Sequence, residues 1–264
     1  MRADLRGDLA RLIEYRDLLY TLSAHRVKVR YKQTALGIAW AILQPVAIML
    51  LFTFIFSFIV RMPSEGLPYA VFAYTALLPW TYFSTALSNG ANGLVSNSQL
   101  ITKVYFPREI LPFTYVIAAL FDFAIASSVL VALMIFYKVS LTANALYAIP
   151  IILILTLFVC AATLLLAALQ VRVRDIGIAM PLLLQVWMLA TPVAYPLSVV
   201  PDRLRPFYLL NPMVGIIENF RRVILYAKPP EISSLAMAGL IAAVLFVASY
   251  IYFKRVEATM ADII

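Results

Sequence analysis

The chain has 264 residues, of which 64% are hydrophobic and only 13% are charged, and its mean hydropathy is +0.93. Soluble domains are about half apolar and about a quarter charged, so this composition excludes a soluble globule and predicts an all-α polytopic membrane protein. The single cysteine and single histidine exclude an intrachain disulfide framework and a multi-histidine or multi-cysteine metal site. A net charge of +8 then indicates membrane topology and anionic lipid contact, and we expect no nucleic-acid partner.

Residues 4–24 predict an amphipathic helix that lies along the cytoplasmic membrane surface. At helical spacing one face carries Leu5, Leu9, Leu12, Ile13, Leu19 and Tyr20, interrupted by Arg16. Acidic residues run throughout this stretch, so it is not a signal peptide. The four cations that follow occupy every second position: Arg26, Lys28, Arg30 and Lys32. On a helix the two arginines fall on one side and the two lysines nearly opposite, which suits a segment at headgroup depth facing lipid phosphate and a second polar group.

Six stretches are long and apolar enough to cross a bilayer as helices of about 20 residues. They are 38–60, 69–94, 113–137, 147–169, 176–197 and 235–253. The fifth contains Pro181, Pro192 and Pro196, which predict a kink or a broken, partly re-entrant helix. With six spans both termini share one side, and the excess of Lys and Arg on that side predicts that they are cytoplasmic.

Asp122 is the one clear ionisable residue within the predicted spans. An intramembrane acid is a functional candidate, and its alternative is a structural acid hydrogen-bonded to Ser127, Ser128 or a neighbouring helix. No Walker A sequence, H-E-x-x-H motif or paired-carboxylate cluster occurs, so we expect no catalytic residue and no metal site. The scarcity of ionisable groups indicates that any transport energy comes from outside the chain.

Two connecting segments carry further candidates. The loop SNSQLITKVYFPREILP, residues 96–112, predicts an exposed apolar and aromatic knob, either a docking feature or a membrane-interface anchor. In the outer segment 198–234, NPMVGIIENFRRVILYA predicts a helix with Asn211 as N-cap and Pro212 at its first position. Glu218 has the spacing for a surface ion pair with Arg221 or Arg222, and the helix is short enough to enter the outer leaflet and return.

The aromatic residues of the spans, chief among them three tryptophans, have two interpretations that the sequence leaves open. They are interfacial anchors, or they line a conduit in which rings stack on the apolar C–H faces of sugars.

Four stretches together resemble one family: VRYKQTALGIAWAILQP (29–45), KVYFPREILP (103–112), VRVRDIGIAMPLLLQVWMLATPVAYP (171–196) and LNPMVGIIENFRR (210–222). In order and spacing they are similar to the permease subunit of ABC-type polysaccharide exporters, a type-2 exporter family that includes O-antigen, capsule and teichoic-acid transporters. The resemblance covers nearly the whole chain. It implies one transmembrane domain over 1–264, with an interface and gate segment (1–37), spans one to five (38–197), an outer gate segment (198–234) and a last span with its tail (235–264).

The resemblance also implies partners and cargo. Such permeases are homodimers in the bacterial inner membrane that pair with two copies of a separate ABC ATPase, which holds ATP and Mg²⁺. The permease itself has no cofactor and no enzymatic activity. The implied cargo is a polyprenyl-pyrophosphate-linked polysaccharide that is moved outward.

Site residues follow from the same resemblance. The cationic cluster defined above would meet the pyrophosphate as a gate. The ATPase would dock on Lys103, Val104, Tyr105, Phe106, Pro107 and Arg108. Channel aromatics would be Trp40, Phe56, Trp80, Tyr82, Trp187 and Tyr195. The outer gate would contain Asn211, Glu218, Arg221 and Arg222.

Three alternatives remain. The same machine could export teichoic acid, capsule or another lipid or drug. A proton-coupled secondary transporter would use Asp122. An intramembrane enzyme acting on polyprenyl phosphate would need a convergent acid or metal constellation, which Asp122 alone does not make.

Overall fold

The computed structural model describes residues 13–32 and 34–263, and every regular element among them is a helix. The main helices are α2 (Arg16–Lys32), α3 (Trp40–Phe52), α4 (Tyr69–Ala91), α5 (Ser98–Lys103), α6 (Ile110–Phe136), α7 (Ala148–Arg172), α8 (Asp175–Leu189), α9 (Arg205–Leu209), α10 (Pro212–Ile224) and α11 (Ile232–Ile263). A 3₁₀ turn, η1 (Gly37–Ala39), and a π-helical turn, η2 (Thr53–Ile59), extend α3 in both directions. The all-helical prediction is therefore confirmed.

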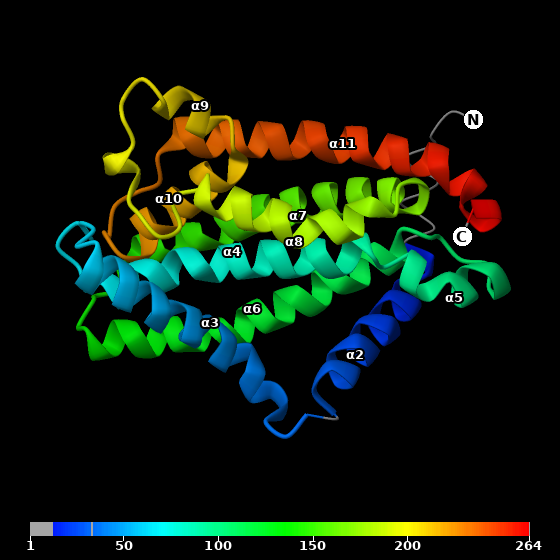
Figure 1. Cartoon of the computed structure of the whole chain (residues 1–264), viewed down its shortest axis with the longest axis horizontal. Helices are drawn as coiled ribbons and strands as arrows, with labels where there is room; N and C mark the ends of the chain where they lie inside the picture. Colours follow the sequence, from blue (N-terminus) through cyan, green and yellow to red (C-terminus); the bar gives the residue numbers. More distant parts are fainter. Residues whose placement is uncertain (1–12, 33, 264) are drawn as a thin grey trace.

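Figure 1 shows α4, α6, α7, α8 and α11 side by side along the long axis, with α2 and α3 forming a V on one side. One end of this bundle carries α5 and the C-terminal end of α11, and we call it the α5 end. The opposite end carries α9 and the loop 61–68, and we call it the α9 end. A hydrogen bond from Ser198 Oγ to Glu65 Oε1 (3.2 Å) joins the segments at the α9 end.

Four segments are long and apolar enough to cross a membrane: Gly37–Ile59, Ile110–Phe136, Ala143–Arg172 and Ile232–Glu257. They coincide with the first, third, fourth and last predicted spans. The other two predicted spans correspond to α4, which has 23 residues, and α8, which has 15. Since α8 is short and α4 is less apolar, length and composition of the described residues support four spans directly.

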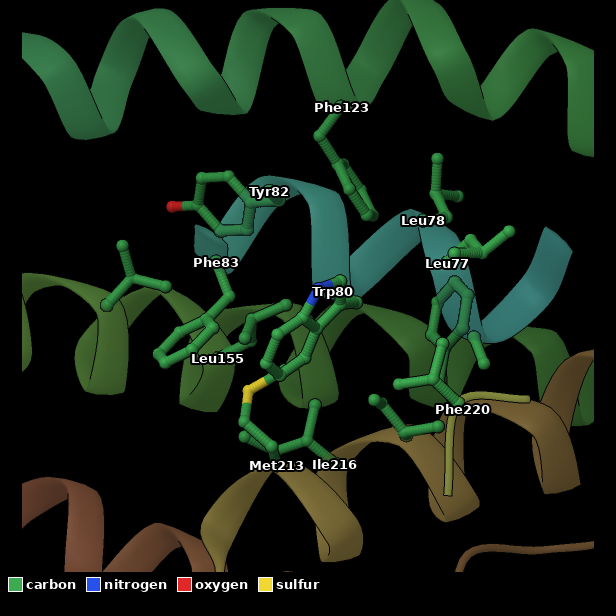
Figure 2. Close-up of a cluster of buried hydrophobic side chains, with 14 of the residues drawn as sticks. Leu77, Leu78, Trp80, Tyr82, Phe83, Phe123, Leu155, Met213, Ile216 and Phe220 are labelled. Atoms are coloured by element: carbon green, nitrogen blue, oxygen red, sulfur yellow. The ribbon is translucent and has the colours of Figure 1, made fainter. Parts of the chain in front are cut away.

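The moderate hydropathy of α4 is consistent with its position in the centre of the helix bundle. Its residues from Tyr69 to Trp80 are all buried, and it packs against α3, α6, α7, α8 and α10. Figure 2 shows Trp80 of α4 facing Met213 and Ile216 of α10, in a cluster that also includes Phe123 of α6. A helix that faces protein on all sides carries small and polar residues instead of lipid-facing apolar ones.

Two predicted boundaries were wrong. The fifth span was predicted over 176–197, but α8 ends at Leu189 and the chain turns through Pro192 and Pro196. Proline lacks an N–H and disfavours helical backbone in the residue before it, whereas Pro181 is accommodated inside α8. The structure also continues α2 through all four cations to Lys32, beyond the predicted end at residue 24.

The apolar face predicted for the N-terminal helix is only partly correct. Leu5, Leu9 and Leu12 lie outside the described residues. Of the others, Leu19 packs with Leu18 and Leu22 against a core cluster that includes Phe253, whereas Ile13 and Tyr20 are exposed. An acid in the first turn and cations in the last turn of α2 complement the helix dipole.

The helix predicted after residue 211 is confirmed as α10, and the Asn211 side chain accepts a hydrogen bond from Met213 N (3.1 Å) as its N-cap. Nearly every residue of α10 is buried, between α4, α7 and α11. Gly215 permits close contact with α11, because a Cβ there would lie 2.8 Å from the carbonyl oxygen of Ser234.

Candidate functional site

The cations of α2 divide into two pairs, as the helical spacing predicts. Arg26 and Arg30 face α6, while Lys28 and Lys32 are exposed. Arg26 Nε donates to Thr114 Oγ1 (2.5 Å), and its guanidinium lies 3.5 Å from the centre of the Tyr115 ring. Burial lowers the pKa of the Arg26 guanidinium, which still remains charged because arginine titrates far above neutrality. One arginine thus anchors α2 to α6.

Asp122 provides the second anchor. Both of its carboxylate oxygens are engaged by α2, one by an ion pair with Arg30 Nη1 and the other by the Tyr31 hydroxyl, which donates over 2.5 Å. Burial, reinforced by Asp122, raises the pKa of Tyr31 to about 12, so Tyr31 stays a donor. Ser127 and Ser128 instead donate to carbonyls of their own helix. The alternative in which a neighbouring helix binds Asp122 is therefore the one that the structure shows.

A cleft of about 770 Å³ opens between α2, α3, α4, α6 and α8. The Arg30–Asp122 pair and Tyr31 lie on its wall, together with Trp40 and one side of the Trp80 and Tyr82 rings. Its remaining polar lining consists of hydroxyls and amides: Thr34, Gln44, Thr81, Ser84, Thr85, Ser88, Asn89 and Gln185. Such a lining offers many neutral hydrogen-bond groups next to aromatic faces.

The six predicted channel aromatics do not form one set. Trp40 is 49% exposed, whereas Trp80 and Tyr82 belong to the core and only border the cleft. Tyr82 donates to Thr156 Oγ1 of α7 (3.3 Å), away from the cleft.

The other three predicted aromatics lie elsewhere. Phe56 stacks on Tyr69 with ring centres 6.4 Å apart. Trp187 donates to Asn211 Oδ1 (3.1 Å) and borders a second cavity of about 720 Å³. Tyr195 donates to Leu189 O (2.7 Å) and pairs with Tyr208. The sequence does not distinguish aromatic residues of the core from those of the cleft wall, because both environments use tryptophan and tyrosine.

The predicted docking loop is exposed over Lys103, Val104 and Tyr105, and Tyr105 is 87% exposed. The prediction was wrong for Phe106, which is buried in an apolar cluster with Ile110 and Phe253. Pro107 and Arg108 are partly buried, and the Arg108 guanidinium donates to the backbone carbonyl of Glu257. The surface available to a partner is therefore centred on Tyr105.

Of the four predicted outer gate residues, Arg221 and Glu218 contact each other. The ion pair with Glu218 forms (3.0 Å), but it was predicted at the surface and the Arg221 side chain is wholly buried. The guanidinium also donates to the carbonyls of Pro192 (2.7 Å) and Val193 (2.6 Å) and lies 3.8 Å from the Phe72 ring centre. Both carbonyls belong to the turn after α8, where Pro192 and Pro196 interrupt the helix, and the buried guanidinium supplies their donors.

Two predicted gate residues have separate roles. Arg222 Nε donates to Pro229 O (2.6 Å) and does not pair with Glu218. Asn211 links its cap to α8 by donating to Thr191 Oγ1 (2.9 Å).

Sequence reasoning missed several partners. Tyr31, Thr114 and Tyr115 hold α2 to α6, and their only signal is their position beside the cations or at the start of a span. It also missed the pairing of Glu109 with Lys254, since the two are far apart in sequence. Among residues 13–32 and 34–263, no group of three or more His, Cys, Asp or Glu side chains is arranged to hold a metal ion.

Comparison with known proteins agrees with this geometry. Residues 17–225 match the family model described as ABC-2 type transporter. The chain is 33% identical to an O-antigen export system permease protein RfbA of Myxococcus xanthus, over 93% of this chain and 95% of the relative. It is 26% identical to an RfbA of Klebsiella pneumoniae (94% and 95%) and 24% identical to a polysialic acid transport protein KpsM of Escherichia coli (91% and 94%). The resemblance expected from the four sequence stretches is confirmed, and the chain belongs to the ABC-2 type transporter family of membrane proteins.

Proposed function

We propose that this chain is the permease subunit of an ATP-driven exporter that moves polyprenyl-pyrophosphate-linked polysaccharide outward across the bacterial inner membrane. The observation that carries the proposal is its similarity, over nearly the full length, to permeases named for O-antigen export. A further relative is named for the transport of another sugar polymer, polysialic acid.

The cleft supports a carbohydrate cargo. Its lining combines exposed aromatic surface at Trp40 with a row of hydroxyl and amide side chains, and it holds little charge beyond the Arg30–Asp122 pair. Sugars present both hydroxyl groups and apolar C–H faces, so such a wall binds them weakly at many positions. Weak contacts that are repeated along the wall of the cleft suit a polymer that moves past it.

The α2 cations support a pyrophosphate-linked carrier. Lys28 and Lys32 are exposed and free to attract a diphosphate at headgroup depth, whereas Arg30 is held by Asp122. A diphosphate that reaches Arg30 offers the bidentate acceptor that arginine prefers, so it competes with the Asp122 carboxylate. Arrival of the carrier would then loosen α2 from α6 and open the cleft.

The proposed architecture has six spans per chain, formed by α3 with its flanking turns, α4, α6, α7, α8 and α11, with α9 and α10 as short outer re-entrant helices. The α5 end then faces the cytoplasm, with both termini, and the α9 end faces outward. The first span is mostly exposed within one chain, so its surface is open to lipid or to a second copy in the proposed homodimer. One chain is also a thin wall for a polymer conduit.

Energy would come from two copies of an ABC ATPase, which bind ATP and Mg²⁺ and dock on the loop around Tyr105. The permease would perform no bond chemistry. A proton-coupled mechanism has less support, since Arg30 and Tyr31 engage both oxygens of Asp122.

The test is to isolate the protein from its native membrane in mild detergent with ATP present and to analyse bound proteins and lipids by mass spectrometry. We expect a Walker-motif ATPase and a polyprenyl-linked glycan. Co-purification of an ATPase with a different lipid would support an ATP-driven exporter and would change the proposed cargo to teichoic acid, capsule precursor or another lipid. Absence of any ATPase, with transport that Asp122→Asn abolishes, would overturn the proposal in favour of a proton-coupled transporter.

A further inference from the structure

A buried polar cluster lies at the α5 end, and the function described so far does not use it. Glu109, the residue before α6, is wholly buried, and its Oε1 atom lies 2.6 Å from Lys254 Nζ on α11. Tyr250 donates to the same oxygen (3.3 Å). Lys254 also pairs with Glu257 Oε2 (3.0 Å), one turn further along α11.

The surroundings of this cluster are apolar: Phe106, Ile110, Phe253, Val256 and Met260 all belong to the adjoining core cluster. Moving a carboxylate and an ammonium group into such a site is costly, and apolar side chains of similar size often stabilise a fold equally well. In the part of the chain that is described, Glu109 Oε2 has no hydrogen-bond partner, which adds to the cost. Stability alone therefore does not account for the cluster.

The cluster joins the loop before α6 to α11. Arg108 donates its backbone N–H to Glu257 Oε1 (3.0 Å) and its guanidinium to the Glu257 carbonyl oxygen. Two consecutive loop residues, Arg108 and Glu109, are thus bonded to one turn of α11. Tyr105, three residues earlier, is exposed. A movement of Tyr105 can therefore reach α11 through the few residues up to Glu109 and their charged contacts.

At its other end α11 is bonded to α10. Asn219 of α10 donates to Ser234 Oγ (2.9 Å) and accepts from Glu231 N (2.6 Å), and the backbones touch at Gly215. α11 is one unbroken helix of 32 residues, and the stretch of about 20 residues from Ser234 to Lys254 corresponds to about 30 Å. A helix without an internal break moves as a unit.

We infer that the cluster of Arg108, Glu109, Lys254 and Glu257 transmits movement of the docking loop to α11, and that α11 passes it to the outer helix α10. The inference rests on the proposed function, because it takes the loop around Tyr105 as the ATPase contact. In this inference the four residues are positioning residues, because they act on export only through α11. Loss of the cluster should separate ATP hydrolysis from export.

The experiment uses the complete permease–ATPase complex in proteoliposomes and compares Lys254→Met with the matched control Arg255→Met, an exposed neighbour on the same helix. We expect Lys254→Met to keep ATPase co-purification and hydrolysis while export falls about tenfold, within the range of usual coupling energies. The control should change export by about twofold at most. Because Lys254→Met leaves Glu109 unpaired, the double variant Glu109→Gln with Lys254→Met removes both charges and protects folding.

A second readout separates transmission from simple support of the fold. Ser233→Cys, in a Cys160→Ala background, places a thiol at the exposed start of α11 for a membrane-impermeant maleimide. We expect ATP to change its labelling rate in the parent complex and not in the neutral double variant. Normal export by the double variant, or an unchanged ATP response of the label, overturns the inference. If the parent permease binds no ATPase, the proposed function is wrong, and the inference, which depends on it, is wrong as well.

Discussion

Replacing Asp122 by Asn should release α2 from α6 without unfolding the protein. The Asp122 and Arg30 side chains are 18% and 33% exposed, so this pair is partly shielded from water. Breaking one side of a fully buried ion pair costs about 3–5 kcal/mol, and a hydrogen bond to a charged group contributes about 1.5–3 kcal/mol. With a third of Arg30 in solvent, we expect a loss of about 2 kcal/mol from the α2–α6 contact, near the lower of these ranges.

Hydrogen exchange of the α2 amides measures this loss directly. About 2 kcal/mol corresponds to a roughly 30-fold increase in the population of the undocked helix, and so in the exchange rate of α2. The contacts of Arg26 with Thr114 and Tyr115 remain, so α6 and the rest of the bundle should keep their protection. Ser128→Ala is the matched control, since Ser128 donates only within its own helix.

Amide exchange rates of residues 16–32 that differ by less than a factor of two between Asp122→Asn and the control would contradict this prediction. A double-mutant cycle adds a stricter check. If Arg30 acts through Asp122, the free energy lost in the double variant Arg30→Gln with Asp122→Asn should be smaller than the sum of the two single losses. The difference should equal most of the interaction energy of the pair. Full additivity would show that the two residues contribute independently.

Three further predictions follow from the contacts. Tyr105→Ala should reduce ATPase co-purification at unchanged thermal stability, whereas Phe106→Ala should destabilise the permease by about 3–5 kcal/mol because a buried ring is removed. Arg221→Met should lower the melting temperature far more than Arg222→Met, since only Arg221 is buried and bonded to the end of α8; equal shifts would contradict this. Gly215→Leu should weaken the α10–α11 contact, measured as faster hydrogen exchange in α10, because its Cβ meets the α11 backbone.

The sequence predicted the elements that depend on local chemistry. Apolar run length placed the first span within a residue at each end, since bilayer thickness sets that length. Asn211 and Pro212 marked the start of α10 because a side-chain cap and a proline are favourable only at that position. Alternation of cations along a helix correctly separated Arg26 and Arg30 from Lys28 and Lys32.

Long-range pairing could not be predicted in the same way. Nothing local distinguishes Asp122 bound to Ser127 from Asp122 bound to Arg30, because both are good donors and the choice depends on how α2 crosses α6. Phe106 was expected at the surface because it lies in a short loop beside Pro107 and between Lys103 and Arg108, yet the adjoining apolar cluster buries it. Tertiary packing decided these cases.

Arginine makes the key ionic contact at two separate places in the structure. At the cleft, Arg30 holds α2 to α6 through Asp122, and at the α9 end Arg221 holds α10 to the turn after α8 through Glu218 and two carbonyls. The two contacts differ in exposure, since Arg221 is wholly buried and Arg30 is partly open to solvent. An anionic ligand can therefore reach Arg30 and compete for it, whereas Arg221 can be released only when α10 itself moves. Under the proposed function, a carrier headgroup arriving at α2 and a displacement delivered through α11 would then release these two arginine contacts by different triggers.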